Sequence, residues 1–270
     1  ERNGVNVVYG FAGLKIHAKL CFVVRREKGK LERYTHIGSG NYNAASAKIY
    51  TDLGLFTANK DINDDVQDLF NVMTGYGLVS HYRKLLVSPH TLRPGITKLI
   101  RREIEQHKKH GNGHIIIKCN QLVDYEMVKV LYEASRAGVK IECIVRGICS
   151  LRPGLPGVSD TITVRSIVGR LLEHARIYYF HNNGDEEMYF GSADLMTRNL
   201  NGRIEVLTPL LQENLCNNVM NQIVIPQLKD NIHAWVMNSD GSYTKLQPKK
   251  DEPVYDSQEE IAKKLNLMKK

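Results

Sequence analysis

Two short motifs in the chain place a histidine two positions before a basic residue. The first is His17-x-Lys19 and the second is His174-x-Arg176. Each motif is predicted to lie on a strand. A hairpin then leads to a second strand that ends in a glycine turn, which reads Gly-Ser-Gly-Asn in the first half and Gly-Ser-Ala-Asp in the second. Because alternate residues of a strand share a face, the histidine and the basic residue of each motif are expected to point the same way. We interpret the two units as a degenerate internal repeat, with duplicated domains that face each other across a shared site.

These residue types suit phosphoryl transfer. An imidazole can carry a phosphoryl group covalently, which splits one difficult displacement into two easier ones. A neighbouring cation such as Lys19 neutralises charge on the phosphoryl oxygens in the transition state. The Gly-Ser-Gly-Asn run is predicted to open a helix whose backbone N–H groups hold a phosphate, and Asn41 either adds a side-chain donor or caps that helix.

A structural role is the competing interpretation for each histidine. For His17 the repeat, the cation and the glycine turn favour catalysis. For His174 the neighbouring Glu173 and Arg176 indicate a polar cleft, and for His36, on the strand before the glycine turn, a structural role is favoured.

An arginine and a tyrosine complete the candidate site. Arg146 ends a predicted strand, at the sheet edge where open parallel sheets collect their ligands, and its guanidinium suits bidentate phosphate contact. Tyr50 either stacks on a nucleobase or packs in the core. Three further arginines are candidates for the same groove or for solvated surface charges, namely Arg152, Arg165 and Arg170.

Apolar periodicity and turn residues predict the elements that position these residues. The predicted strands are Val5–Phe11, Lys19–Arg26, Leu31–Ile37, Gly113–Cys119, Val139–Arg146, Ile162–Ser166, Ala175–Phe180, Met188–Gly191 and Arg203–Leu207. The predicted helices are Asn41–Tyr50, Ile62–Met73, Ile96–His110, Asp124–Ala137, Gln212–Gln227 and a C-terminal helix with a capping box of Ser257 and Glu260. The alternation of strands and helices after residue 95 predicts a mainly parallel sheet covered by helices.

Composition narrows the class of protein. The chain has 270 residues, enough for one large or two ordinary domains, with a net charge of +8. That charge favours polyanionic partners, and nucleic acid, anionic lipid and polyphosphate all satisfy it, as does a basic protein without such a ligand. No window of 18 apolar residues predicts a transmembrane segment, and the first residues do not read as a signal peptide. Five cysteines without a CxxC pair predict reduced thiols rather than a metal site.

Longer strings around these motifs resemble a known family. The paired motifs resemble those of the phospholipase D superfold, and GLKIHAKL, YTHIGSGNYN, AKIYTDLGL, LVDYEMVKVLYEASRAGVKIECIVRGICSLRPG and LEHARIYYF resemble polyphosphate kinase of the long, first class. The resemblance extends from residue 1 to about 238. It implies an α/β fold of two phospholipase D-like domains, each a mixed, mostly parallel sheet flanked by helices, at residues 1–84 and 85–240, with a polar tail at 241–270. The first domain is expected to be incomplete at its N-terminus.

The resemblance also implies an activity, the reversible transfer of the terminal phosphate of ATP to inorganic polyphosphate through a phosphohistidine. His17 would be the nucleophile, and His174 would contact the nucleotide phosphates or act as acid–base partner. Tyr50 would stack on adenine and Arg146 would contact phosphate, while Lys19, Asn41 and Arg176 would complete the site. Magnesium would accompany ATP, with its protein ligands upstream of this chain.

The resemblance carries further expectations and leaves alternatives open. A homo-oligomer, a cytoplasmic location that allows peripheral contact with the inner membrane, and no nucleic-acid partner are expected. Arg176 stands where the phospholipase D pattern has lysine, and neither half has that pattern's aspartate at the usual spacing, which argues against phosphodiester hydrolysis. The alternatives are a phospholipase D-like phosphodiesterase or nuclease, and a polyanion-binding module that is inactive without upstream domains.

Overall fold

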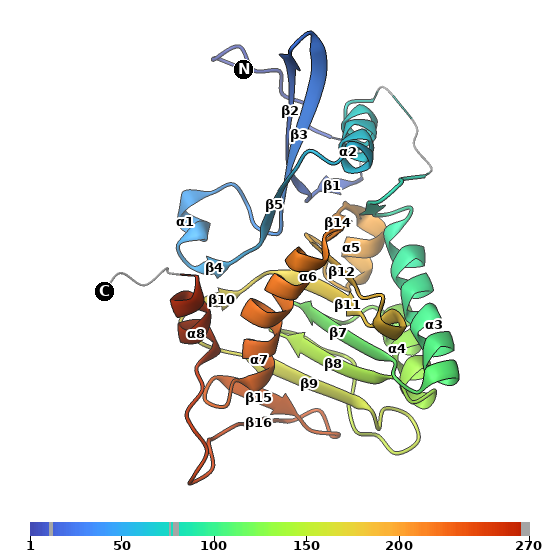
Figure 1. Cartoon of the computed structure of the whole chain (residues 1–270), viewed down its shortest axis with the longest axis vertical. Helices are drawn as coiled ribbons and strands as arrows, with labels where there is room; N and C mark the ends of the chain where they lie inside the picture. The colour runs from blue at the N-terminus through green and yellow to red at the C-terminus, as the bar shows by residue number, and fades with distance from the viewer. Residues whose placement is uncertain (11–12, 76, 78–80, 266–270) are drawn as a thin grey trace.

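The computed structural model describes all residues except 11–12, 76, 78–80 and 266–270. Figure 1 shows a small N-terminal sheet standing above a much larger sheet that carries helices on both faces. The small sheet contains a hairpin, β2 and β3, whose two-residue turn places Lys28 and Gly29 at φ of 48° and 82°. The left-handed region at both positions suits the tight turns that join antiparallel strands. The elements of this part are β1 (Lys15–Ile16), β2 (Lys19–Glu27), β3 (Lys30–Gly38), α1 (Ala44–Ala47), β4 (Tyr50–Thr51), β5 (Gly54–Thr57) and α2 (Lys60–Met73).

The large sheet has nine strands in the order β16-β15-β9-β8-β7-β11-β12-β14-β6. Parallel pairing is confined to β7, β8 and β9, and the other neighbours are antiparallel. The sheet is therefore mixed, as predicted, but its parallel part is smaller than predicted. Its strands are β6 (Leu86–Val87), β7 (His114–Cys119), β8 (Lys140–Val145), β9 (Ile162–Ile167), β11 (Arg176–Phe180), β12 (Glu187–Gly191), β14 (Val206–Pro209), β15 (Ala234–Met237) and β16 (Tyr243–Lys245).

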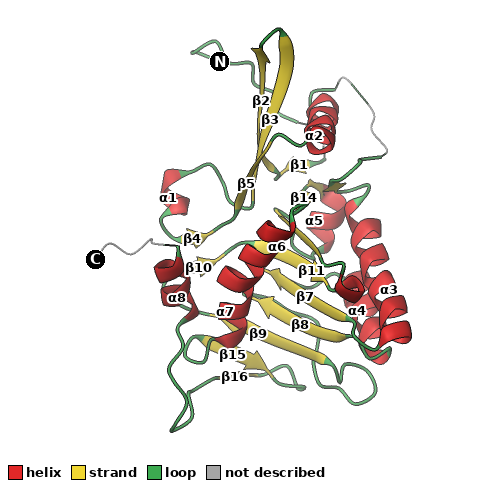
Figure 2. Cartoon of the chain, in the orientation of Figure 1, coloured by secondary structure: helices red, strands yellow, loops and turns green. Residues whose placement is uncertain are grey.

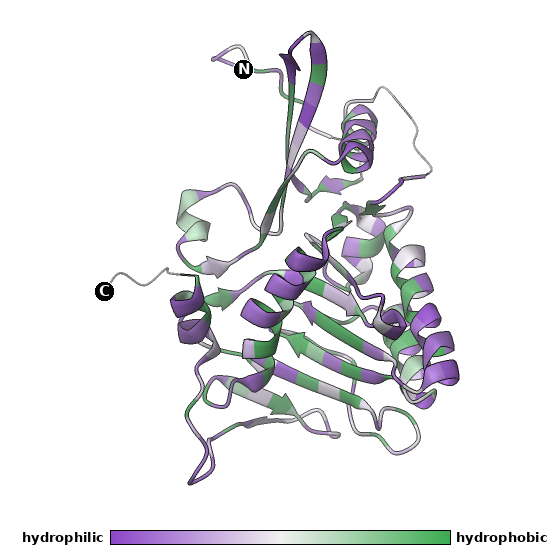
Figure 3. Ribbon diagram, viewed as in Figure 1, coloured by the Kyte–Doolittle hydropathy of each residue, from purple (hydrophilic) through white to green (hydrophobic). Residues whose placement is uncertain are grey.

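Helices cover both faces of this sheet (Figure 2). Along β7, Ile115 and Ile117 join the core under one pair of helices, whereas Ile116 joins the core on the opposite face. This alternation follows from the two-residue period of a strand, and Figure 3 shows apolar strands under helices with polar outer faces. The first pair is α3 (Leu92–His110) and α4 (Tyr125–Arg136); the other face carries α6 (Glu213–Val219), the π-helical turn Met220–Val224 and α7 (Ile225–Lys229).

Two short parallel ladders join the N-terminal part of the chain to the large sheet. Strand β1 pairs with β13 (Arg203–Ile204), and β4 pairs with β10 (Leu172–Glu173). Neither ladder belongs to either main sheet. Each ladder ends beside one of the motif histidines, so these pairings decide where the two halves meet.

Most of the predicted elements are confirmed, including the long helices α2, α3 and α4 and the strands β2, β3, β7, β8, β9, β11 and β12. Asp124 caps α4 as predicted, since its side chain accepts a hydrogen bond from the Met127 N–H. The remaining helices are the short α5 (Thr197–Gly202) and the C-terminal α8 (Ser257–Lys264). None of the helices in the described part of the chain has the length and apolar character that a bilayer-spanning segment needs.

Several local predictions are wrong. Residues 5–10 form no strand, and Val5 and Tyr9 are 61% and 88% exposed; Phe11 lies outside the described residues. The motif histidines lie at breaks between strands rather than within them. The predicted strand Arg203–Leu207 is interrupted at Glu205, which separates β13 from β14.

Helix ends account for the other differences. The predicted helix Asn41–Tyr50 shrinks to the four residues of α1, and its cap is Asn43. The predicted helix Gln212–Gln227 is broken by the π-helical turn. The cap of α8 is Asp256, whose side chain accepts from the Glu259 N–H, so the predicted capping box that begins at Ser257 is wrong. The tail predicted to be loose contributes β16 to the sheet edge.

The glycine of the Gly-Ser-Ala-Asp run, Gly191, permits close packing of β12 against β14. A Cβ built on Gly191 would overlap the backbone carbonyl of Val206, whereas one built on Gly202 meets nothing within 4 Å. We predict that Gly191→Ala lowers the free energy of unfolding by about 3 kcal/mol because backbone cannot yield to the methyl group. Gly202→Ala, the matched control, should change it by less than about 1 kcal/mol. Equal stability of the two variants in denaturant unfolding would contradict this packing.

Candidate active site

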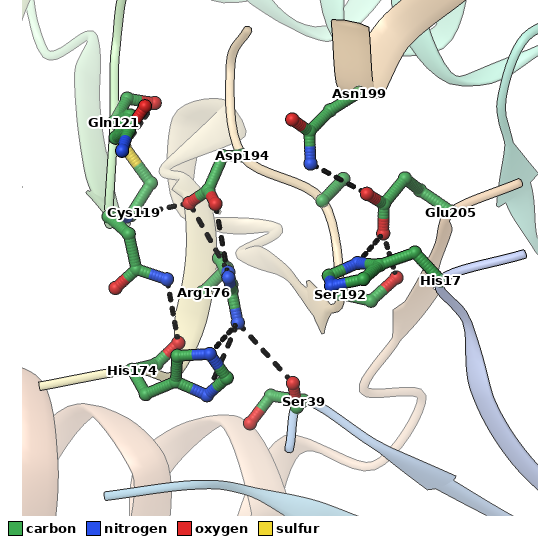
Figure 4. A network of polar contacts seen from close by, with 12 residues as sticks. His17, Ser39, Cys119, Gln121, His174, Arg176, Ser192, Asp194, Asn199 and Glu205 are labelled. Carbon is green, nitrogen blue, oxygen red and sulfur yellow. Dashed lines mark hydrogen bonds and ion pairs between the residues drawn. The ribbon is translucent and has the colours of Figure 1, made fainter. Parts of the chain in front are cut away.

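His17 is placed by the first short ladder. The backbone N–H groups of His17 and Ala18 both donate to the Ile204 carbonyl, at 3.0 Å each. The residue that follows β13, Glu205, accepts a hydrogen bond from His17 Nδ1 at 2.8 Å (Figure 4). Because this contact occupies Nδ1, the imidazole presents Nε2 as the ring nitrogen for an incoming group.

Glu205 is fully buried and held on both oxygens. Ser192 Oγ donates to Oε2 at 2.5 Å, and Asn199 Nδ2 donates to Oε1 at 2.6 Å. Arg203 NH1, from β13, lies 3.8 Å from Oε1 and supplies a nearby cation. Hydrogen bonds of this kind fix a carboxylate that in turn fixes its histidine. Sequence reasoning missed Glu205; its signal was a carboxylate between the apolar residues Ile204 and Val206 of a predicted strand.

His174 is placed by the second ladder and held by a carboxylate of the first half. Its Nδ1 donates to Asp52 Oδ1 at 2.8 Å, and Ser39 Oγ donates to the same oxygen at 2.7 Å. Arg176 NH1 lies 3.1 Å from His174 Nε2. Since arginine can only donate, Nε2 acts as an acceptor there and the ring is neutral.

The pKa shifts agree with this arrangement. Burial lowers the pKa of His174, against the opposing effect of Asp52, so the neutral form is favoured. Burial raises the pKa of Asp52, but the hydrogen bonds from His174 and Ser39 outweigh it, and the net shift is downward. Nε2 carries the one lone pair of this neutral ring, so His174 can take a proton or a hydrogen bond from an incoming group there in exchange for the contact from Arg176.

Each histidine is therefore oriented by a carboxylate of the opposite half. His17 of the first half is paired with Glu205 of the second, and His174 of the second with Asp52 of the first. Sequence reasoning did not assign Asp52 a role, although it lies in the AKIYTDLGL string. The predicted shared site between two duplicated halves is consistent with this reciprocal pairing.

Arg176 links the two halves beneath the histidines. It forms a two-point ion pair with Asp194, at 3.2 Å from Nε to Oδ1 and 3.0 Å from NH2 to Oδ2. Its NH1 also donates to the Ser39 carbonyl at 3.3 Å, so Arg176 connects the glycine turns of both halves (Figure 4). Asp194 in turn accepts from the Asn120 backbone N–H at 2.7 Å. This places the carboxylate of the Gly-Ser-Ala-Asp run as the anchor of Arg176.

Lys19 is 6% exposed, and its Nζ donates to the His17 carbonyl at 2.5 Å. Burial lowers the pKa of Lys19 to about 8. The charge of Glu205 opposes this shift, and the charge of Arg176 adds to it. Burial therefore destabilises the charged form of the Lys19 side chain.

Two of the other predicted residues lie beside this centre. The Tyr50 ring packs on the His174 ring, with centroids 4.7 Å apart and a tilt of 37°. Arg146 follows β8, as predicted; burial and then Arg176 lower its pKa, and its NH1 is buried without a hydrogen-bond partner among the described residues. An unsatisfied buried donor of this kind suits an anionic ligand.

The remaining predicted residues do not join the centre. Asn41 is exposed and does not cap α1; Asn43 instead accepts from the Ala45 and Ser46 N–H groups, so those donors are not free for a phosphate. His36 contacts the Tyr42 hydroxyl at 2.7 Å and packs on Phe56.

Of the three arginines predicted as candidates for the groove, one contacts a helix and two are exposed to solvent. Arg165 donates to the Leu228 carbonyl at 2.5 Å and so faces α7 rather than the groove. Arg152 is exposed beside the turn at Gly241, and Arg170 is exposed.

Comparison with known proteins shows the family of this chain. The model of polyphosphate kinase C-terminal domain 1 matches residues 1–78, and that of C-terminal domain 2 matches residues 85–258. The chain belongs to the polyphosphate kinase family. It is 54% identical over 246 residues to polyphosphate kinase of Prosthecochloris aestuarii, covering 91% of this chain and 34% of the relative. It is 49% identical to polyphosphate kinase 1 of Chlorobaculum tepidum over all of this chain and 38% of the relative.

A solved structure supports the same assignment. The crystal structure of polyphosphate kinase from Porphyromonas gingivalis superposes with a TM-score of 0.92 at 38% identity, covering 98% of this chain and 41% of that one. The mixed α/β fold flanked by helices, predicted from the sequence, is confirmed. The chain spans little more than a third of the length of these family members.

The buried Lys19 generates a prediction about stability and pH. The unfolded chain binds the lysine proton up to a pKa of 10.5, whereas the folded chain releases it near 8, so wild-type stability gains from rising pH in this window. Lys19→Met lacks that gain. Its free energy of unfolding relative to wild type should fall by about 2 kcal/mol between pH 7 and pH 10. Lys15→Met removes an exposed lysine nearby and controls for loss of one charge. A difference independent of pH in urea titrations would refute a lowered pKa for Lys19.

Proposed function

We propose that this chain forms catalytic machinery of a polyphosphate kinase, which transfers the terminal phosphate of ATP reversibly to inorganic polyphosphate through a phosphohistidine at His17. The observation that supports this proposal most directly is the His17–Glu205 pair, which occupies Nδ1 and leaves Nε2 as the ring nitrogen for an incoming group. Family membership supports the substrates, and the net charge of +8 suits polyanions.

The covalent step follows from this geometry. His17 Nε2 attacks the terminal phosphorus of ATP; an N–P bond forms, the bridging P–O bond breaks, and its electron pair leaves on ADP. Positive charge develops on the imidazole during the attack, and Glu205 stabilises it through Nδ1–H. Attack by a terminal polyphosphate oxygen on the same phosphorus then breaks the N–P bond and restores His17.

The other residues act on charge and orientation. Lys19 and Arg176 neutralise phosphoryl oxygens in the transition state, and Arg146 offers an unsatisfied donor to the nucleotide phosphates. Neutral His174 contacts the phosphates or moves a proton at the leaving oxygen. Tyr50 is proposed to contact adenine, since it lines a cavity of about 530 Å³ next to His174. Asn41, exposed beside the glycine turn, remains a phosphate-contact candidate.

Magnesium is proposed to be bound by the phosphates of ATP rather than by side chains of this chain. Within the described ranges, no three His, Cys, Asp or Glu side chains are grouped to hold a metal ion. The carboxylates of the site are already paired, Glu205 and Asp52 with histidines and Asp194 with Arg176. We therefore assign no step to a protein-held magnesium ion here. A cytoplasmic location and a homo-oligomer stay predictions from the resemblance.

The nucleophile can be tested directly. In the full-length protein incubated with ATP and magnesium, mass spectrometry should find an acid-labile, alkali-stable phosphate on His17. His17→Gln should lose this phosphate and reduce polymer synthesis by at least about a thousandfold. His90→Gln, which alters an exposed histidine, is the matched control and should retain both. Polymer synthesis that survives in His17→Gln would exclude His17 as the nucleophile and direct attention to His174.

A further inference from the structure

The residues just before His174 are held by the C-terminal helix α8. The Gln258 side chain binds both backbone groups of Leu171: its Oε1 accepts from the N–H at 2.9 Å, and its Nε2 donates to the carbonyl at 2.8 Å. The same Nε2 donates to Glu173 Oε1 at 2.8 Å. One amide therefore fixes the segment that runs into β10 and His174.

Glu173 adds a second anchor at this point. It is 2% exposed and pairs with Lys118 of β7, also 2% exposed, at 2.9 Å. Gln227 Nε2 and Thr51 Oγ1 donate to the same oxygen as Lys118, at 2.6 and 3.0 Å. Removing a partner from a buried charge of this kind is costly because water cannot replace it.

Backbone hydrogen bonds on both sides of His174 hold this segment against the first half of the chain. The Leu172 N–H donates to the Ile49 carbonyl and the Ala175 N–H to the Thr51 carbonyl, at 2.8 and 2.9 Å. These bonds set the distance between His174 and Asp52, which follows Thr51 in the chain. A shift of residues 171–173 would therefore move the imidazole relative to Asp52 and Arg176.

A glycine in the loop after β9 allows α8 to approach closely. A Cβ on Gly169 would lie 2.5 Å from Gln258 Oε1, so a residue without a side chain lets the amide reach Leu171. The start of α8 is held separately, since Asp230 Oδ2 accepts from the Ser257 N–H at 2.9 Å and Asp256 contacts His233 at 3.1 Å. Gln258 is thus presented from a fixed helix start.

We propose that α8 positions His174 for phosphoryl transfer and that Gln258 is the positioning residue, acting through Leu171 and Glu173. This inference rests on the proposed function for the role of His174. Gln258 touches neither the histidine nor any reacting atom. Because Gln258 also lines the cavity assigned to adenine, an effect through the backbone of His174 is recognised by a change in kcat, whereas an effect on nucleotide binding would change the KM for ATP.

The test is a double-mutant cycle in the full-length protein, measured as the rate of polymer synthesis from ATP. Gln258→Met keeps the length of the side chain but removes its hydrogen bonds. It should lower kcat about tenfold in the wild-type background and have no further effect in a His174→Ala background. Lys264→Met, which removes a contact from α8 to the Asn221 carbonyl, is the matched control and should retain wild-type kcat.

Two results would overturn the inference. An unchanged kcat in Gln258→Met would show that the hydrogen bonds do not matter, and an equal loss in both backgrounds would show a general structural effect. A readout independent of turnover separates this inference from the proposed function. In ¹⁵N-histidine-labelled protein, the His174 ring signals should shift in Gln258→Met and stay in place in Lys264→Met. If wild type made no polyphosphate, the proposed function would fail, and these signals would still decide whether Gln258 positions the ring.

Discussion

The structure depends on two histidine–carboxylate pairs that are exchanged between its halves. Glu205 reaches across to His17 and Asp52 reaches across to His174. Neither half alone can orient its own histidine in this way. The short ladders β1–β13 and β4–β10 belong to neither main sheet, and they bring each histidine next to the carboxylate of the other half. The packing of the two halves and the orientation of both histidines thus depend on the same contacts.

The second constraint is the positive charge held under the site. Lys19 and Arg176 are both almost completely buried, yet only Arg176 has a two-point carboxylate partner. The lowered pKa of Lys19 shows that its charge is held there at a cost. Such a cost is reasonable where a polyanionic substrate supplies the missing negative charge, because the ligand then repays the desolvation of the cation.

Most of the candidate site residues could be predicted from the sequence, because the repeated His-x-basic and Gly-Ser motifs are local. The same holds for β2, β3, α2 and α4, whose periodicity and caps lie within single segments. The roles of Glu205 and Asp52 were not readable, since each partner lies more than a hundred residues away. Of the two roles considered for Asn41, phosphate contact or helix cap, the cap is wrong, because the helix begins later and uses Asn43. The strand predicted at residues 5–10 failed because apolar residues alone do not supply a pairing partner.

In the proposed mechanism, Glu205 holds Nδ1 of His17 and leaves Nε2 for the phosphoryl group. Heteronuclear NMR of the ¹⁵N-histidine-labelled, phosphorylated protein distinguishes the two phosphohistidine isomers by the ring nitrogen that couples to phosphorus. We expect phosphorus on Nε2 of His17. Phosphorus on Nδ1, or on any other histidine, would contradict it.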